Sequence, residues 1–539
     1  MSTGLVVEQL ATTLASVGAK SVGPILVRND HIQFCVTKND DGCAWMLRLE
    51  ANLPLTQMPD VYLADPSAGA ELAHVTYGGK VCYSDHEGEG FDANSAAHVI
   101  AFAVSQSLDV LDDAAEKRAA DNFQDRLDEF EGYWFSLPNC ALVALDALPG
   151  DRQLYARVRV TKTGVSILGI DSGISPDMQG TRRKIHFFKL SSPLLPPVNG
   201  QDWRQEWLPR LITHAGNEAE EIASQPGSHI FLFQQQRSEG DSFYGITFNS
   251  SRRRKGVVTL SKPRPFAIQR SWRDHLLRRT GSTSSKRKVA IIGCGSVGSR
   301  VAEQLALAGI DELVLVDPDR MAHDNIYRHV LGRSSVGKYK VEALKQEFEE
   351  KRTALRVDAV PGYALDWLKM ASNRMGCDTI IMTTGQLALE REITRRAFVE
   401  DWPQRLISGW VEPFGLGGHA IESRPRLKGC LECLHTNIEG QASPSNRAAF
   451  LEPGQKFSRN LTGCGGAFTP YSSLDATRSA FLVTEMALSD HSGYRCWLGD
   501  SARAEAQGLR VTSLYTRLKS GQSDSFPDVA QGGCACCNT

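Results

Sequence analysis

The chain has 539 residues, enough for two or three domains, with 42% hydrophobic residues and a formal net charge of −2. This balance is typical of a globular protein and argues against bulk electrostatic binding of nucleic acid or of an acidic membrane surface. No apolar run is long enough to cross a bilayer and the N-terminus lacks a signal-peptide pattern, so we expect a cytoplasmic protein with no membrane partner. In a reducing compartment, the thirteen cysteines are expected to be metal ligands, nucleophiles or packing residues rather than disulfides.

The first quarter of the chain mixes helical and strand-like patterns. A helix is predicted over residues 1–18, followed by strands in the sequences ILVRN, IQFCV and AWMLRLE. Apolar residues at helical spacing predict helices from about residue 95 to residue 131. This order predicts an α+β domain over residues 1–138.

Residues 139–270 are predicted to form a β-rich linker domain, in which one clear helix stands near residues 207–212. The strand-like sequences are LYARVRV, IHFFKL, HIFLFQ, FYGITF and GVVTL. From residue 271 onwards strands and helices alternate, which predicts a parallel α/β domain over residues 271–539.

A glycine-rich turn opens the α/β domain. Gly293, Gly295 and Gly298 follow a buried strand and precede a helix, so phosphates can approach the backbone at the helix N-terminus. The next strand, ELVLVD, ends at Asp317, where a carboxylate would bind ribose hydroxyls. Alone, this pattern predicts a Rossmann-type nucleotide fold and does not separate a nicotinamide enzyme from other nucleotide-binding proteins.

The sequence DPDRMAHDNIYRHVLGRSSVGKYK resembles the ThiF/MoeB and ubiquitin-activating superfamily. The resemblance implies that an acidic pair, an Asn-x-x-Arg segment and a Gly-Lys-x-Lys segment line the triphosphate of ATP. When a carboxylate attacks the α-phosphorus and pyrophosphate leaves, cations must stabilise the phosphate oxygens, and Arg328 and Lys340 are the predicted catalytic pair. The alternative is a solvated basic loop. The matching residues are Asp317, Asp319, Asn325, Arg328, Lys338 and Lys340.

The superfamily's magnesium-binding aspartate is missing from this chain. The resemblance implies it after the next strand, but here DTIIM is followed by TTGQ. Thr384 and Gln386 carry no charge, so Asp319 or Glu390 is the expected Mg²⁺ ligand.

Two Cys-x-x-Cys pairs predict a structural zinc site. Cys430 and Cys433 form the first pair, and Cys534 and Cys537 form the second near the C-terminus, with Cys536 as a competing ligand. Four thiolates on two turns supply a closed tetrahedral Zn²⁺ site, and MoeB-like and autophagy-type activating enzymes resemble this chain in placing such pairs. The alternative is a tail of unliganded thiols.

Cys464 is the predicted thioester-forming cysteine of the α/β domain. Flanking glycines predict an exposed loop, and a helix is expected from about Ser473, whose N-terminus would lower the pKa of a nearby thiol. The segment resembles the position of the catalytic cysteine in the divergent activating enzyme of autophagy. The alternative is a buried packing thiol.

The first 135 residues resemble a prokaryotic ubiquitin-conjugating fold. In the segment from His74 to Gly79 and Cys82, the resemblance implies that Cys82 accepts an acyl group from Cys464 and presents it to an amine. Val75 and Thr76 stand where the family has Pro-Asn, so the usual oxyanion donor is not identifiable. The candidates for a residue that orients or deprotonates the nucleophile are Asp85, His86, Asp92 and His98.

The order of the three domains resembles the ubiquitin-activating and ubiquitin-conjugating fusion of bacterial CBASS anti-phage operons. The resemblance implies ATP, Mg²⁺ and Zn²⁺ as cofactors, a homodimer, and a substrate with a flexible C-terminus, such as a cGAS-like nucleotidyltransferase or a ubiquitin-like protein, joined to a target amine. Two alternatives remain open: an adenylating enzyme for a sulfur-carrier protein, and a non-catalytic scaffold.

Overall fold

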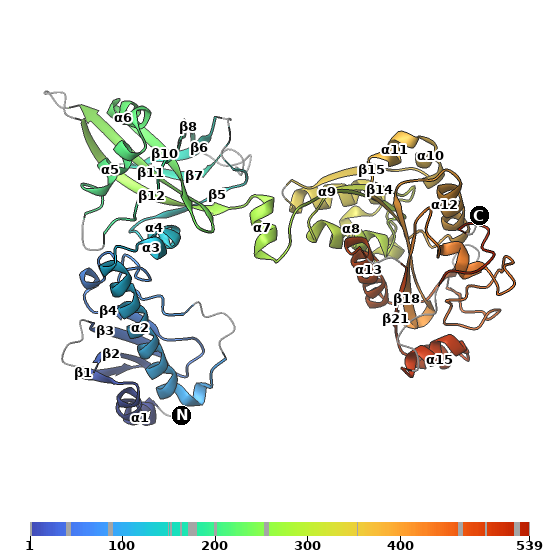
Figure 1. Ribbon diagram of the computed structural model, residues 1–539, viewed down its shortest axis with the longest axis horizontal. Coiled ribbons are helices and arrows are strands. Elements are labelled where there is room, and N and C mark those ends of the chain that lie inside the picture. Colours follow the sequence, from blue (N-terminus) through green and yellow to red (C-terminus); the bar gives the residue numbers. More distant parts are fainter. Residues whose placement is uncertain are drawn as a thin grey trace. The chain divides into compact units, whose positions relative to one another are not determined.

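The computed structural model of the protein describes residues 3–38, 45–84, 90–148, 150, 153–161, 164–170, 180–198, 202–252, 258–352, 354–461, 467–490, 493–521 and 529–537. The chain divides into two compact units, Met1–Ser271 and Trp272–Thr539, and each is described by itself (Figure 1). Among the residues described, no helix combines the length and the apolar composition that a membrane span requires.

The N-terminal part of the first unit is a four-stranded antiparallel sheet whose strands pair in chain order, β1–β2–β3–β4. Buried side chains of two helices and of the strands, such as Leu10, Phe34 and Ile100, form one core. The predicted first helix and the three predicted strands are confirmed. The elements are α1 (Thr3–Ser16), β1 (Ala19–Arg28), β2 (His31–Lys38), β3 (Leu47–Asn52), β4 (Asp60–Leu63), η1 (Pro66–Gly69), η2 (Ala93–Ser95) and α2 (Ala96–Ala119).

The helical stretch predicted up to residue 131 is broken. Helix α2 ends at Ala119, because Asp121 adopts a left-handed conformation with φ of 53°. Two short helices follow, α3 (Gln124–Asp128) and α4 (Phe130–Phe135). They turn the chain away from α2 and supply residues to the cavity beside Cys82.

The rest of the first unit is β-rich, as predicted, with one sheet ordered β5–β12–β11–β10–β9 and another ordered β7–β6–β8. Aromatic side chains fill its core: the Phe130 and Tyr244 ring centroids lie 4.3 Å apart, and the Trp134 indole donates to the Phe266 carbonyl at 3.1 Å. Helix α4 therefore packs with the five-stranded sheet. The elements are β5 (Ala141–Leu145), β6 (Tyr155–Thr161), β7 (Gly164–Ile170), β8 (Thr181–Lys184), β9 (His186–Lys189), α5 (Trp207–His214), α6 (Asn217–Ser224), β10 (Gly227–Arg237), β11 (Gly240–Arg252) and β12 (Val258–Arg270).

The second unit is built on a seven-stranded sheet in the order β15–β14–β13–β16–β17–β18–β21, with the predicted parallel strands from β15 to β17 and two antiparallel strands at the far edge. The strands are β13 (Ser285–Ile292), β14 (Ile310–Val316), β15 (Arg356–Val360), β16 (Thr379–Met382), β17 (Arg405–Val411), β18 (Gly417–Ser423) and β21 (Tyr494–Leu498), with a separate short pair β19 (Arg459–Asn460) and β20 (Ala467–Phe468). The helices are α7 (Arg273–Arg279), α8 (Gly298–Leu307), α9 (Lys340–Lys351), α10 (Ala364–Lys369), α11 (Ala371–Met375), α12 (Leu387–Val399), α13 (Ser473–Leu488), α14 (Ala502–Glu505) and α15 (Ser513–Lys519), and the 3-10 turns are η4 (His323–Asn325), η5 (Arg333–Ser335), η6 (Pro413–Gly415) and η7 (Leu431–His435).

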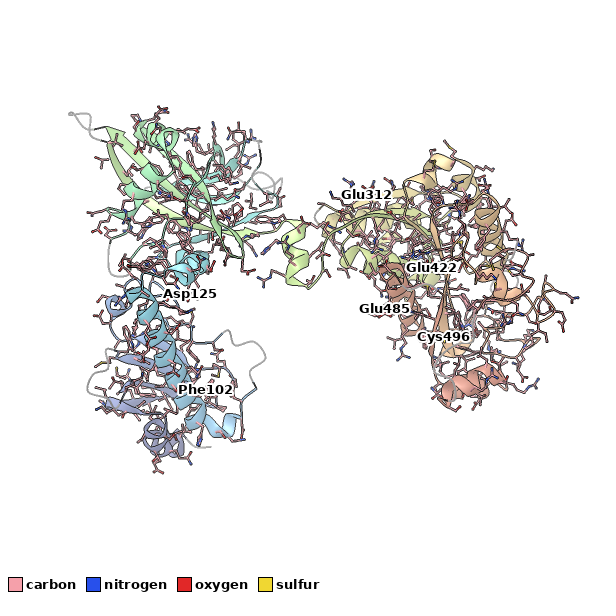
Figure 2. The ribbon with its side chains drawn as sticks, in the orientation of Figure 1. Phe102, Asp125, Glu312, Glu422, Glu485 and Cys496 are labelled. Atoms are coloured by element: carbon pink, nitrogen blue, oxygen red, sulfur yellow. The ribbon has the colours of Figure 1, made fainter. Side chains whose placement is uncertain are left out.

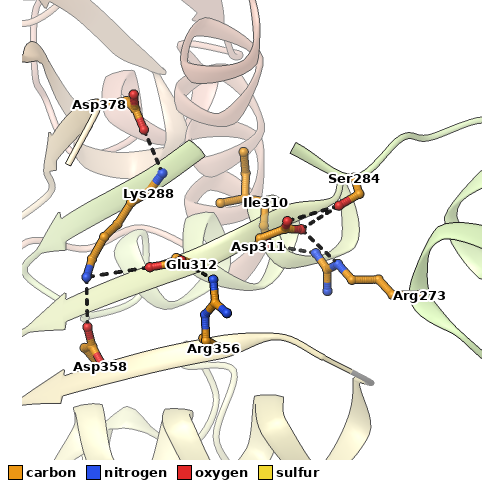
Figure 3. A network of polar contacts seen from close by, with 9 residues as sticks. All are labelled: Arg273, Ser284, Lys288, Ile310, Asp311, Glu312, Arg356, Asp358 and Asp378. Atoms are coloured by element: carbon orange, nitrogen blue, oxygen red, sulfur yellow. Dashed lines mark hydrogen bonds and ion pairs between the residues drawn. The ribbon is translucent and has the colours of Figure 1, made fainter. Parts of the chain in front are cut away.

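A polar network crosses three parallel strands before they reach their carboxyl ends (Figure 3). Lys288 of β13 places its ammonium 3.1 Å from Asp358 of β15 and 3.7 Å from Glu312 of β14. Arg273 of α7 donates to Asp311 at 3.1 Å and thereby fixes α7 to β14. These charged groups therefore lie on the strands before their carboxyl ends, and not at those ends.

Candidate functional site

A cavity of about 1010 Å³ opens at the carboxyl ends of β13, β14 and β16. Strand β13 lies between β14 and β16, so this is the point where the strand order reverses and where open α/β sheets bind ligands. Gly293 and Gly295 line the cavity. A Cβ on Gly293, at φ of 87°, would lie 2.7 Å from the Thr384 backbone, and one on Gly298 would lie 1.9 Å from the Gly293 carbonyl. The turn therefore requires glycine at both positions.

Buried hydrogen bonds hold the glycine turn against β14. The Asp317 carboxylate, 5% exposed, accepts from the backbone N–H of Cys294 at 2.6 Å and of Asp319 at 2.8 Å. Burial raises the pKa of Asp317 and of the Cys294 thiol. His329 bonds the Cys294 carbonyl at 2.8 Å, and burial lowers the pKa of His329 to about 4, so its ring is neutral and donates that bond. Asp317 thus fixes the turn besides facing the cavity.

The predicted cations come together in the cavity with one exception. Arg328 and Lys340 both line it, although they lie on different segments after β14. The Lys340 side chain is 8% exposed and its ammonium lies 2.8 Å from Asp319, whose side chain is 64% exposed. Asn325 also lines the cavity and accepts from the backbone of the preceding turn. Lys338 is exposed and is not among the lining residues.

Glu390 lies at the cavity wall below the segment where the superfamily's aspartate is missing. Its carboxylate is 5% exposed and accepts from the N–H of Thr384 at 2.9 Å and from its hydroxyl at 2.8 Å. Burial raises the pKa of Glu390 to about 7. A carboxyl group of α12 therefore lines this cavity, as does Asp319.

Four cysteine sulfurs meet at one point of the second unit. The Sγ atoms of Cys430, Cys433, Cys534 and Cys537 all lie within 4.8 Å of one another. The Cys430 sulfur is 3.9 Å from those of Cys433 and Cys534, which matches the spacing of about 3.8 Å that four ligands at about 2.3 Å from a tetrahedral Zn²⁺ produce. Cys536 is buried but is not one of the four. The predicted ligand set is brought together, and its donor chemistry fits zinc.

Cys464 falls within residues 462–466, which lie outside the described residues. The described chain resumes at Ala467, and Ala467 and Phe468 line the nucleotide cavity. Helix α13 begins at Ser473, as predicted, with reciprocal capping bonds between Ser472 and Asp475. The described residues that directly follow the segment carrying Cys464 therefore lie at the cavity wall.

A second cavity, of about 220 Å³, lies beside Cys82 in the first unit. Cys82 is exposed, and its backbone N–H donates to the His74 carbonyl at 2.8 Å. Glu129 accepts from the His74 backbone at 2.7 Å, and its other oxygen lies 2.5 Å from the His74 Nδ1. The hydrogen bond with Glu129 raises the pKa of His74. Although Cys82 is exposed as a residue, partial desolvation of its sulfur and the nearby Glu129 carboxylate raise the pKa of its thiol. His74 Nε2 also lies 3.9 Å from Asp125 of α3, labelled in Figure 2.

Of the four polar residues predicted to assist Cys82, the two that the structure describes do not line its cavity. Asp85 and His86 fall outside the described residues, Asp92 caps η2 by accepting from Asn94 at 2.9 Å, and His98 is exposed on α2. The sequence analysis missed Glu129 and Arg126. Nothing local in the sequence points to them, because both lie more than forty residues after Cys82, on α3 and in the turn before α4.

Comparison with known proteins places the second unit in a family. Residues 278–456 match the ThiF family. The chain is 25% identical over 267 residues to the ATP-dependent ubiquitin transferase-like protein Cap2 of Pseudomonas aeruginosa, covering 48% of this chain and 44% of the relative. It is 20% identical over 501 residues to Cap2 of Vibrio cholerae, covering 81% of this chain and 84% of the relative. It is 44% identical over 64 residues to the adenylyltransferase and sulfurtransferase uba4 of Aspergillus clavatus, covering 12% of this chain and 13% of the relative. The first of these alignments spans less than half of the relative's length.

Among solved structures, Escherichia coli MccB with MccA-N7isoASN is 18% identical and covers 47% of this chain and 67% of that chain, with a TM-score of 0.32. The sequence match, together with the glycine turn and the strand order, shows that the C-terminal unit of this chain contains a domain of the ThiF family, over residues 278–456.

Proposed function

We propose that this chain activates the C-terminal carboxylate of a protein with ATP, carries the acyl group as a thioester on Cys464 and then on Cys82, and joins it to a target amine. The observation that carries the proposal is the cavity that unites Gly293, Arg328 and Lys340 at the carboxyl ends of the parallel strands. Pyrophosphate departs with several negative charges, and paired cations in a walled cavity stabilise them in the transition state.

Two metal ions would fit this scheme. Asp319 and Glu390 both line the cavity, and they would hold Mg²⁺ near the phosphates of ATP, where the ion neutralises charge. Cys430, Cys433, Cys534 and Cys537 would hold Zn²⁺, which joins the C-terminal tail to η7. Zinc here is structural, because four thiolates leave no open coordination position.

Two thioesters follow from two cysteines in separate units. Exchange of one thiolate for another is close to isoenergetic, so transfer from Cys464 to Cys82 depends on proximity, which one chain or a homodimer supplies as effective concentration. The name of the Cap2 relatives, a ubiquitin transferase-like protein, supports conjugation as the outcome. The substrate we favour is a protein with a flexible C-terminus, either a cGAS-like nucleotidyltransferase or a ubiquitin-like protein.

Variants of the two cysteines test the sequence of steps. Cys464→Ala should still exchange pyrophosphate into ATP but should form no later adduct. Cys82→Ala should accumulate an adduct on Cys464 that dithiothreitol removes, while conjugates disappear, and intact-mass analysis locates each adduct. Conjugation by Cys82→Ala at the wild-type rate would show that the first unit is a binding module and would contradict the proposal.

A sulfur-carrier adenylyltransferase is the second candidate, favoured by the short match of higher identity to uba4. That function uses the cavity of the second unit and gives Cys82 no role. The same variants separate the two functions: a carrier protein that is adenylated and thiolated equally well by wild type and Cys82→Ala identifies the second candidate.

A further inference from the structure

The cavity beside Cys82 is lined by a buried arginine. Arg126 of α3 lines this cavity and is 6% exposed. Its Nη2 donates to the carbonyl of Pro196 at 3.3 Å, and Pro196 lines the same cavity, so the guanidinium lies at the cavity wall. Among the described residues no carboxylate forms an ion pair with Arg126.

An acidic residue close to Arg126 in sequence is engaged elsewhere. Glu129, one helical turn after Arg126, uses both oxygens on His74. Glu71 favours the charged form of Arg126 electrostatically but is exposed, and burial opposes that charge. An arginine remains protonated even so, and keeping a guanidinium out of water without an anionic partner costs stability. Such a cost is typical of a group placed for a charge that is present only during a reaction.

The chemistry proposed for Cys82 creates such a charge. A lysine amine attacks the thioester carbonyl on Cys82, a C–N bond forms, and the carbonyl electron pair moves onto oxygen. The tetrahedral oxyanion then collapses, the C–S bond breaks, and the proton lost by nitrogen ends on the Cys82 sulfur. The asparagine that would donate to this oxygen in the conjugating family is absent, since Val75 and Thr76 occupy its place.

We propose that Arg126 is the oxyanion-stabilising residue of the acyl-transfer site at Cys82, and that α3 delivers it to a cavity otherwise lined by the segment that carries His74 and Cys82, by α4 and by Pro196. Glu129 acts as a positioning residue, because it holds the left-handed His74, at φ of 61°, whose carbonyl accepts from the Cys82 backbone. This inference rests on the proposed function of Cys82. The reaction thus requires α3 and the turn before α4 in addition to the segment that carries His74 and Cys82.

The test uses the full chain carrying Cys464→Ala, so that discharge is measured apart from adenylation. Cys82 is acylated with a glycylglycine thioester of mercaptoethanesulfonate, and discharge of that adduct onto free lysine is followed by intact mass. Arg126→Met should discharge on the order of 100-fold more slowly. The loss should be constant from pH 6 to pH 9, because arginine does not titrate there. Arg126→Lys should lie between, and ethylguanidinium added to Arg126→Ala should restore part of the rate.

Arg118→Met is the matched control. Arg118, near the end of α2, donates to the Ala70 carbonyl at 3.0 Å and does not line the Cys82 cavity, so its variant should discharge like wild type. Equal thermal melting and equal acylation of Cys82 exclude misfolding as the cause of a slow rate. Discharge of Arg126→Met within twofold of wild type would overturn the inference and leave the proposed function intact. Failure of wild-type Cys82 to accept or discharge an acyl group would instead refute the proposed function, and the role of Arg126 with it.

Discussion

Replacement of Lys340 by alanine should separate catalysis from stability in the second unit. The Lys340 side chain lines the cavity of the glycine turn, and the proposed function places its ammonium beside the phosphates of ATP. Removing one such cation from a walled site costs on the order of 3 kcal/mol of transition-state stabilisation, or about 100-fold in rate. Its ion pair with Asp319 contributes at most about 1 kcal/mol to folding, because the Asp319 side chain is 64% exposed and solvent screens it.

The measurement is exchange of labelled pyrophosphate into ATP in the presence of the substrate protein, together with thermal melting of each variant. Lys345→Ala is the control, since Lys345 lies on the same helix and pairs at 3.8 Å with Glu349 on its surface. Lys338→Ala adds a separate comparison, because Lys338 belongs to the predicted set but is exposed outside the cavity. Unchanged exchange in Lys340→Ala, with wild-type melting, would refute the reasoning and remove Lys340 from the site.

Three further variants test the metal site, a buried carboxyl group and the glycine turn. A chain ending at Gly533 should lose one Zn²⁺ per chain by elemental analysis and melt at a lower temperature. The Cys536→Ser variant should keep its zinc and its melting temperature. Zinc retained by the shorter chain would contradict the assignment of Cys534 and Cys537 as ligands. Burial raises the pKa of Glu390 from 4.5 to about 7, so between these pH values the folded state holds a proton that the unfolded state has lost. The free energy of unfolding should therefore fall by about 3 kcal/mol as pH rises from about 4.5 through about 7. Urea unfolding should show this slope flattened in Glu390→Gln, and an unchanged slope would contradict it. Gly298→Ala should destabilise the protein by about 2 kcal/mol or more and weaken ATP binding in calorimetry, because its Cβ would meet the Gly293 carbonyl; wild-type stability would contradict that geometry.

Most of the second unit could be predicted from local patterns in the sequence. The alternation of strands and helices, the glycine turn and the Cys-x-x-Cys spacing each depend on residues a few positions apart, and the structure contains the corresponding parallel sheet and cysteine cluster. The cations after β14 were predicted through a resemblance, and Arg328 and Lys340 do reach one cavity. Lys338 does not: it lies exposed before α9, whereas Lys340 is a buried residue of that helix.

The Cys82 site was predicted only in part, because its geometry depends on distant residues. His74 and Glu129 are 55 residues apart in sequence, and the helical pattern up to residue 131 gave no sign of the break at Asp121 that turns α3 and α4 toward the cavity. The second short helix α6 was missed for a similar reason, since its burial depends on packing against the β-rich sheet. Hydrogen bonds between residues far apart in the sequence produce no periodic pattern from which they could be predicted.

The two cavities differ in charge in the way that the two proposed reactions require. Adenylation releases pyrophosphate, and the cavity of the second unit offers both Arg328 and Lys340. Aminolysis of a thioester creates a single oxyanion, and Arg126 is the one arginine or lysine among the described residues that line the cavity of the first unit. A second unpaired cation beside Cys82 would repel the lysine ammonium that must approach and lose its proton. The distribution of cations therefore supports a division of labour in which charge-rich phosphate chemistry stays in the second unit and the amine is admitted only to the first.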